Sequence, residues 1–400
     1  MRSMFTAIAV FVLLGAMSAH ADVVTDANAK AAEVASKSPA TPPAVRTMAI
    51  VQVSVFDAVS AITGRYPAVR AKLTAPRDAS VDAAVAAATR TALSKLMPAQ
   101  QAAIDADYQA LIRMVPDGRA KTDGSIAVGE QAAKTIVAAC AADGFNAPNT
   151  YRPHTTPGVY VPTMFPAVPH WGKRKAWVMT SGDQFRPGPP PALTSETWKR
   201  DFSEIKAVGG KTSTQRTPEQ TAIAQFWEAT LPNVYWPVAR SVASTPGRDV
   251  TDNARLLALA AMAMDDALIA VFDAKYTYNF WRPVTAIRNA EGDARDPGWM
   301  PFIDTPMHPE YPCAHCIVSG SLGAVLQAEL GSGPAPKLSS SSSTAGGAVR
   351  TWVSVDDFVH EVAVARIYDG VHYRNSTEVG TAMGKKIGAL AVKSVPKATR

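Results

Sequence analysis

The chain has 400 residues, of which 47% are hydrophobic and 18% are charged, a balance that fits a globular protein and excludes a largely disordered one. Lys and Arg exceed Asp and Glu by 40 − 34 = 6, and this excess is not gathered into runs. A nucleic-acid-binding protein usually carries a concentrated basic stripe, so we expect no nucleic acid as a partner and favour a small anionic substrate. The length fits one large domain or two intimate ones.

The N-terminus carries the pattern of a secretory signal. Arg2 supplies a positive charge, residues 5–17 form an apolar run, and Ala19-His20-Ala21 places small residues where a signal peptidase reads them. The run is shorter than the about 18 apolar residues of a membrane anchor. We therefore expect residues 1–21 to be a signal peptide cleaved after Ala21, a periplasmic or secreted protein, and no transmembrane segment.

Alanine-rich segments with helical spacing dominate the rest of the chain, and each is closed by Gly, Pro or a polar turn. The expected helices are 47–62, 81–97, 100–115, 121–142, 217–231, 251–275, 309–330, 354–368 and 376–392. The period-2 alternation of β-strands is nearly absent. The predicted fold is all-α, a helical bundle with long loops.

Two irregular tracts interrupt this pattern. Residues 149–192 are rich in Pro and aromatic residues, and we expect a packed loop that wraps the bundle. Residues 331–348 contain five consecutive serines, Ser339 to Ser343, a composition that predicts a mobile surface insertion.

The first candidate site segment lies near the C-terminus. An apolar face with helical spacing runs from Val355 to Val362, and its continuation by four residues reaches Arg366. A guanidinium directed into a core keeps its proton and therefore needs an anionic partner. Gly370 then ends the helix, and His372 follows. The alternative is a structural salt bridge between Arg366 and a buried acid, with His372 on the surface.

The second segment is His308-Pro309-Glu310-Tyr311-Pro312-Cys313-Ala314-His315-Cys316. Pro312 fits the first position of the following helix. The N–H groups of Cys313, Ala314 and His315 would then point out of the helix N-terminus, which is a ready anion site. His315 would serve there as a general acid.

The third segment follows the most apolar helix, residues 256–272. Lys275 and Arg282 are seven residues apart, so a continuous helix would place them on one face about 10 Å apart, although Pro283 disfavours helical geometry at Arg282. The alternative is that both cations reach the surface at a helix end. Together the three segments predict a deep site for a multiply charged tetrahedral anion.

At these residues the chain resembles the superfamily that joins vanadium-dependent haloperoxidases to bacterial acid phosphatases and type 2 phosphatidic acid phosphatases. The site of that superfamily consists of a Lys separated by six residues from Arg-Pro, then Pro-Ser-Gly-His, then Ser-Arg, three residues, Gly, one residue and His. The residues that match in order and spacing are Lys275, Arg282-Pro283, Pro312-Cys313-Ala314-His315, Ala365-Arg366, Gly370 and His372. Residues 48–62 also resemble the N-terminal helix of the bacterial haloperoxidase-like branch.

The resemblance implies one helical domain over residues 22–400, with the site within about residues 250–395. In a haloperoxidase, His372 would bind vanadate, and the substrates would be halide and peroxide. In a phosphatase without a cofactor, His372 would form a phosphohistidine while His315 protonates the leaving group of a phosphoester. In either case Lys275, Arg282 and Arg366 would neutralise the equatorial oxygens of the anion.

Four residues depart from the pattern. Cys313 replaces the Ser whose hydroxyl donates to the anion, and Ala314 replaces a Gly that lets the backbone approach closely. Ala365 replaces the Ser before Arg366. Ser376 stands where phosphatases often place an Asp that orients the nucleophilic His, so we expect His372 to be a weaker base.

Three other classes of function stay open. A non-catalytic oxyanion-binding relative would explain these departures. Cys313-Ala314-His315-Cys316 also has the spacing of a dithiol redox motif, although no strand precedes it, and a structural zinc lacks a second ligand pair. With Cys140 the exported chain has three cysteines, an odd number that leaves at least one thiol unpaired or paired with another molecule.

The remaining titratable candidates have minor predicted roles. His308 is expected to support the site from its periphery, and one of Asp265 and Asp266 to orient a catalytic histidine. The histidines expected to be structural or solvated are His154, His170 and His360.

Overall fold

The computed structural model describes residues 22–116, 119–230 and 232–397. The predicted signal peptide, residues 1–21, lies outside the described residues. The α-helices are α1 (Val23–Ala35), α2 (Thr41–Thr63), α3 (Val81–Leu96), α4 (Gln101–Arg113), α5 (Arg119–Cys140), α6 (Glu196–Val208), α7 (Pro218–Trp227), α8 (Trp236–Ala243), α9 (Val250–Tyr278), α10 (Pro283–Arg288), α11 (Ala314–Leu330), α12 (Val355–Tyr368) and α13 (Arg374–Ser394). Short 3₁₀ helices are η1 (Pro98–Gln100), η2 (Trp171–Lys173) and η3 (Gly292–Ala294). The all-α prediction is confirmed.

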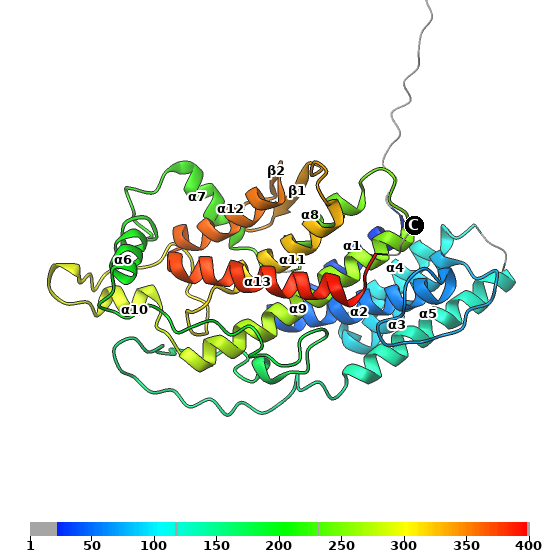
Figure 1. Ribbon diagram of the computed structural model, residues 1–400, viewed down its shortest axis with the longest axis horizontal. Helices are drawn as coiled ribbons and strands as arrows, with labels where there is room; N and C mark the ends of the chain where they lie inside the picture. The colour runs from blue at the N-terminus through cyan, green and yellow to red at the C-terminus, as the bar shows by residue number, and fades with distance from the viewer. Residues whose placement is uncertain (1–21, 117–118, 231, 398–400) are drawn as a thin grey trace, which may run out of the picture.

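Helix α9 is the axis of the molecule. Its residues 254–272 are buried, because the helix is apolar on all faces and must be covered by neighbours on every side. Helices α2, α11 and α13 contact it, and Figure 1 shows α2, α9 and α13 running together along the long dimension. The Asp249 side chain accepts hydrogen bonds from the N–H groups of Thr251 and Asp252 and so caps the helix N-terminus.

Helices α11 and α13 pack closely through small residues. A Cβ atom at Gly384 would lie 2.1 Å from the carbonyl oxygen of Ile317, and one at Gly388 would lie 2.3 Å from that of Ser321. Only glycine permits this approach, which brings the N-terminus of α13 beside the N-terminus of α11.

The Pro-rich tract is tied to the bundle by a buried ion network. Arg174 pairs with Asp143 at 2.7 Å and with Asp265 at 2.8 Å. Asp266 accepts the backbone N–H groups of residues 177–179 at 2.7–3.0 Å. The prediction that one of these two α9 carboxylates orients a catalytic histidine was wrong, because both hold this loop.

The serine-rich tract forms part of an antiparallel hairpin of β1 (Leu338–Ser342) and β2 (Ala348–Trp352). Ser340 and Ser342 are buried, and the Ser340 hydroxyl donates to the carbonyl of Val234 at 2.8 Å. The predicted mobile insertion was wrong, since alternate serines pack inward with a backbone partner that composition does not reveal.

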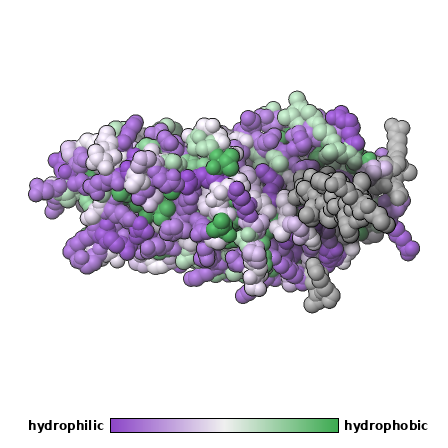
Figure 2. Space-filling model, turned by 90° about the horizontal axis from the view of Figure 1, so that it is seen from above, coloured by the Kyte–Doolittle hydropathy of each residue, from purple (hydrophilic) through white to green (hydrophobic). Residues whose placement is uncertain are grey.

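Among the described residues one helix, α2, is long and apolar enough to cross a membrane, judged by length and composition alone. However, 89% of its most apolar stretch is buried inside the protein, as in the core helix of a folded bundle. The face of the molecule in Figure 2 is mostly hydrophilic, with scattered apolar residues.

Candidate anion-binding site

Three chain segments meet at the end of the bundle where α9 finishes. Lys275 lies in the last turn of α9, and Arg282 occupies the N-cap position of α10. Arg366 lies in the last turn of α12, whose C-terminus is followed by Gly370 with φ 77°. This left-handed glycine turns the chain back, so that His372 faces the same interior as the three cations. All four side chains are buried, with residue exposures between 0 and 2%.

The two cations from the third sequence segment bond only to neutral groups. Lys275 Nζ donates to the carbonyls of Pro309 at 2.9 Å and Glu310 at 2.8 Å. Arg282 donates to the carbonyls of Val371 and His308 at 2.7 and 2.9 Å. The predicted alternative of surface cations was wrong, and a buried positive charge held by carbonyls attracts an anion.

Arg282 also links the histidines of the site. Its Nη2 lies 2.9 Å from His308 Nδ1, and its Nη1 lies 3.3 Å from His372 Nε2. His308 therefore takes the supporting place expected of it. Burial and the neighbouring cations lower the pKa of His308 well below its usual value, so the ring is neutral and accepts from the guanidinium.

Arg366 has an acidic partner of its own. Its Nη1 lies 2.7 Å from Asp369 Oδ2 and donates to the carbonyl of Trp227 at 2.8 Å, while its buried Nε has no hydrogen-bond partner among the described residues. The structural salt bridge considered as an alternative for Arg366 is therefore present. The second half of that alternative, a surface His372, was wrong. Burial raises the pKa of Asp369 to about 7, although Arg366 opposes the shift.

A carboxylate that sequence reasoning missed lies beside His372. Its Nδ1 lies 2.8 Å from Glu310 Oε1, which also accepts the backbone N–H of Tyr373 at 3.0 Å. Burial, followed by the charges of Arg282 and Lys275, lowers the pKa of His372 well below its usual value. Burial raises the pKa of Glu310 to about 7, so its ionised form, present at and above this pH, accepts the proton of Nδ1 and leaves the lone pair of Nε2 on the side of Arg282.

The expectation that His372 lacks a carboxylate partner was therefore wrong, although Ser376 does replace the Asp of the phosphatases. Glu310 lies 62 residues before His372 in the chain. The available signal was an acidic residue inside an aromatic and proline-rich segment five residues before His315. A pattern built on residues downstream of His372 does not include it.

The N-terminus of α11 departs from its predicted form. Its N-cap is Cys313, so Pro312 precedes the helix instead of opening it. The Cys313 N–H donates to the Ser376 carbonyl at 3.2 Å, and Cys313 Sγ is joined to Cys316 in a disulfide. Cys313 thus offers neither a thiol proton nor an unengaged N–H, and its prediction as an oxyanion donor was wrong. Ala314, in the first turn, remains a candidate through its backbone N–H.

His315 lies in the same first turn and is partly buried. Its Nε2 is buried and has no hydrogen-bond partner among the described residues. Burial, assisted by Arg366, lowers the pKa of His315 well below its usual value, so it is neutral and open to accept a proton. Tyr235 O–H donates to the backbone carbonyl of His315 at 3.4 Å and fixes the turn.

The structure also places the remaining cysteines and histidines of the sequence analysis. Both disulfide sulfurs are buried, and Cys140 is a buried free thiol, as the odd count requires. In the part of the chain that the structure describes, no three His, Cys, Asp or Glu side chains are grouped to hold a metal ion, which removes the structural zinc. His154 and His360 are exposed, and His170 contacts the carbonyl of Phe145.

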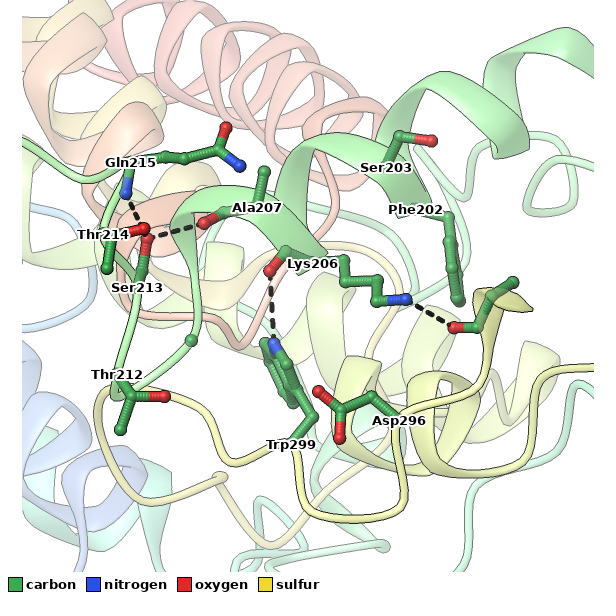
Figure 3. Close-up of a pocket in the computed structure, with 12 residues that line it drawn as sticks. Phe202, Ser203, Lys206, Ala207, Thr212, Ser213, Thr214, Gln215, Asp296 and Trp299 are labelled. Atoms are coloured by element: carbon green, nitrogen blue, oxygen red, sulfur yellow. Dashed lines mark hydrogen bonds between the residues drawn. The ribbon is translucent and has the colours of Figure 1, made fainter. Parts of the chain in front are cut away.

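A separate open pocket of about 500 Å³ lies between α6 and the loops at residues 210–215 and 294–299 (Figure 3). Lys206 Nζ donates to the carbonyl of Ala294 at 2.8 Å, and Trp299 Nε1 donates to the carbonyl of Lys206 at 3.3 Å. None of the predicted site residues lines this pocket, so it is distinct from the anion site.

The fold and site together define a class: a helical bundle with buried Lys, Arg and neutral His side chains gathered at the end of its central helix. Comparison with known proteins narrows this class. Residues 255–400, which contain every predicted site residue, match the family described as the VCPO second helical-bundle domain. The sequence is 28% identical over 189 residues to vanadium chloroperoxidase from Curvularia inaequalis, covering 39% of this chain and 31% of that protein. The match thus spans about a third of the relative's length.

Solved structures resemble the whole fold. The first bacterial vanadium-dependent iodoperoxidase superimposes with a TM-score of 0.81 and 26% identity, over 94% of this chain and 97% of that one. An apo bacterial vanadium-dependent chloroperoxidase superimposes with a TM-score of 0.73 and 18% identity, over 88% and 93% of the two chains, which supports the fold alone. The resemblance to vanadium haloperoxidases is confirmed.

Proposed function

We propose that the protein is a vanadate-dependent haloperoxidase that oxidises a halide with peroxide. One observation carries the proposal: Lys275 and Arg282 are basic side chains whose pKa values are lowered by burial, and they bond to carbonyls and imidazole nitrogens close to Nε2 of His372. An oxyanion beside Nε2 would add negative charge to that of Glu310 and so favour the charged forms of both side chains. The similarity to the iodoperoxidase makes iodide the first halide to test.

The residues fit vanadate through two kinds of group. His372 offers a nitrogen lone pair whose direction Glu310 holds. Lys275, Arg282 and the free Nε edge of Arg366 offer charged donors for equatorial oxygens. Bound vanadate would supply a Lewis-acidic centre for the activation of peroxide.

In this proposal the side chains of the site stabilise negative charge and transfer protons. The three cations stabilise negative charge in a site from which water is largely excluded, where their effect is much stronger than in bulk water. In this proposal the neutral His315 takes a proton from peroxide and returns it to the departing oxygen, and the buried Nε2 supports this role.

Phosphoester hydrolysis is the second candidate, and Glu310 favours it. A carboxylate bound to Nδ1 raises the nucleophilicity of Nε2, as a phosphohistidine mechanism requires. A non-catalytic oxyanion-binding protein is the third candidate, supported by the loss of a hydroxyl donor at Cys313. In each case the signal pattern at residues 1–21 supports export to the periplasm or the medium.

The deciding experiment measures purified protein with and without orthovanadate, on iodide or bromide plus peroxide and on a phosphomonoester. Halide oxidation that requires vanadate selects the peroxidase, and hydrolysis inhibited by vanadate selects the phosphatase. His372→Ala should abolish either activity, while His360→Ala, an exposed histidine on α12, should leave it unchanged. Activity that survives His372→Ala refutes the site, and vanadate binding without turnover identifies the non-catalytic relative.

A further inference from the structure

Glu310 is more firmly placed than a chance neighbour of His372. Its residue is fully buried, its N–H donates to the carbonyl of Phe280 at 2.9 Å, and its carbonyl accepts Lys275 Nζ at 2.8 Å. Its Oε1 accepts from His372 Nδ1 and from the next residue's backbone N–H. Backbone and side chain are both fixed, so the direction of the imidazole ring is fixed as well.

The second carboxylate oxygen gives an independent observation. Glu310 Oε2 is buried, and the Ser376 hydroxyl is its side-chain hydrogen-bonding neighbour, because this hydroxyl helps to lower the pKa of Glu310 against the effect of burial. Both residues line one small cavity of about 10 Å³. Burial of a carboxylate costs stability, so the presence of Glu310 here is better explained by a role in the site than by folding.

Glu310 and Ser376, which are far apart in the sequence, meet at this cavity. Ser376 stands where the phosphatases of this superfamily often carry an Asp toward the histidine. Here the carboxylate comes instead from Glu310, on the segment before α11, and a small hydroxyl remains at the α13 position.

We propose that Glu310 is the positioning residue of His372, holding the proton on Nδ1 and the lone pair of Nε2 toward the bound oxyanion. Glu310 lies on the Nδ1 side of the ring and acts through His372 rather than on the substrate. The proposal rests on the proposed function for the identity of the oxyanion. The position of the His372 proton is a property of the anion-free protein.

The test compares three variants. Glu310→Met removes the acceptor and the charge while keeping side-chain length. Glu310→Gln keeps an oxygen acceptor for Nδ1 but removes the charge. Glu310→Met combined with Ser376→Asp returns a carboxylate from the other side of the cavity. Glu361→Met is the control, since Glu361 is a mostly buried carboxylate that pairs with Arg350 away from His372.

Two measurements distinguish a role of Glu310 in positioning His372 from a role in packing alone. The ¹⁵N spectrum of labelled histidines, with His372 assigned by its loss in His372→Ala, reports which ring nitrogen carries the proton. Calorimetric titration of the anion-free protein with orthovanadate, and separately with inorganic phosphate, reports affinity. In Glu310→Met we expect mixed protonation of Nδ1 and Nε2 and a roughly 10- to 100-fold weaker affinity, as for other partners that orient a ligating histidine.

We expect Glu310→Gln to keep the proton on Nδ1 and to lose less affinity, and the double variant to recover at least half of the lost affinity on a logarithmic scale. A wild-type proton pattern and affinity in Glu310→Met would overturn the proposal. Equal losses in the single and double variants would overturn it as well, because they indicate a packing role. If wild-type protein binds neither anion, the proposed function fails, but the ¹⁵N pattern still decides the role of Glu310.

Discussion

Replacement of Lys275 by Met tests the anion site through stability. An anion that binds only the folded protein stabilises it by RT ln(1 + [L]/Kd), which is about 2.7 kcal/mol at 100 times the Kd. For a chain of about 380 residues the entropy of unfolding is about 0.8 kcal/mol per degree, so this stabilisation raises Tm by about 3 °C. Wild-type protein should show a shift of this size with orthovanadate.

Loss of one buried charged donor weakens binding by about 2–5 kcal/mol. At the lower limit the Kd rises about 30-fold. The same anion concentration then stabilises Lys275→Met by only about 0.9 kcal/mol, and the Tm shift falls to about 1 °C. The absolute Tm of the variant also depends on the carbonyls of Pro309 and Glu310, which lose their donor. The difference in Tm with and without the anion removes this contribution.

The assay is thermal unfolding followed by circular dichroism, with and without orthovanadate. Lys206→Met is the matched control, since Lys206 also donates to two backbone carbonyls but lies in the separate pocket (Figure 3). The control should keep the full anion-dependent shift. An undiminished shift in Lys275→Met would show that the anion binds elsewhere, and the cation argument would fail.

Three further predictions concern Gly370, which precedes His372, and the two α9 carboxylates that hold the Pro-rich loop. Gly370→Ala should lower Tm and activity together, because its φ is 77° and a Cβ would lie 2.2 Å from the Gly209 carbonyl oxygen. The control is Gly247→Ala, which has φ 84° and open space around the new Cβ, so it should lower the free energy of unfolding by only about 1–3 kcal/mol. Equal losses of stability in the two variants would contradict the prediction. Asp265→Asn should destabilise the fold by about 3–5 kcal/mol in urea unfolding, since it leaves a buried arginine under-paired, yet anion affinity per folded molecule should be unchanged. Burial raises the pKa of Asp266 to about 7, so the folded state holds a proton that the unfolded state releases from about pH 4. The proton held by Asp266 therefore stabilises the folded state at low pH, and this contribution is lost as the pH rises from about 4 toward 7. Asp266→Asn should reduce the slope of unfolding free energy against pH in that window by up to about 1.4 kcal/mol per pH unit. An unchanged slope would show that Asp266 is ionised throughout.

Local pattern was sufficient for much of the fold. Apolar periodicity and capping residues predicted the long helices, and the all-round apolarity of residues 256–272 predicted the buried axis helix. Short amphipathic helices such as α8 and the weakly marked α1 were missed, since eight to thirteen residues carry little periodic signal.

The core of the site was also predictable, because its residues occur in short blocks with characteristic spacing. The sequence by itself determined that Lys275, Arg282, Arg366 and His372 are present at that spacing. Only the tertiary structure decided that all four are buried together. Burial is what makes their charge significant, since the attraction for an anion grows as water is removed.

The partners of these residues depended on the fold alone. Glu310 reaches His372 across 62 residues, and the disulfide of Cys313 removes the donor that its position suggested. Asp265 and Asp266 hold a loop that lies about 90 residues earlier in the chain. Such pairings arise from the packing of segments that are distant in the chain, and no local periodicity or spacing encodes them. The sequence thus determined the chemistry available to the site, and the packing decided which groups remain free to use it.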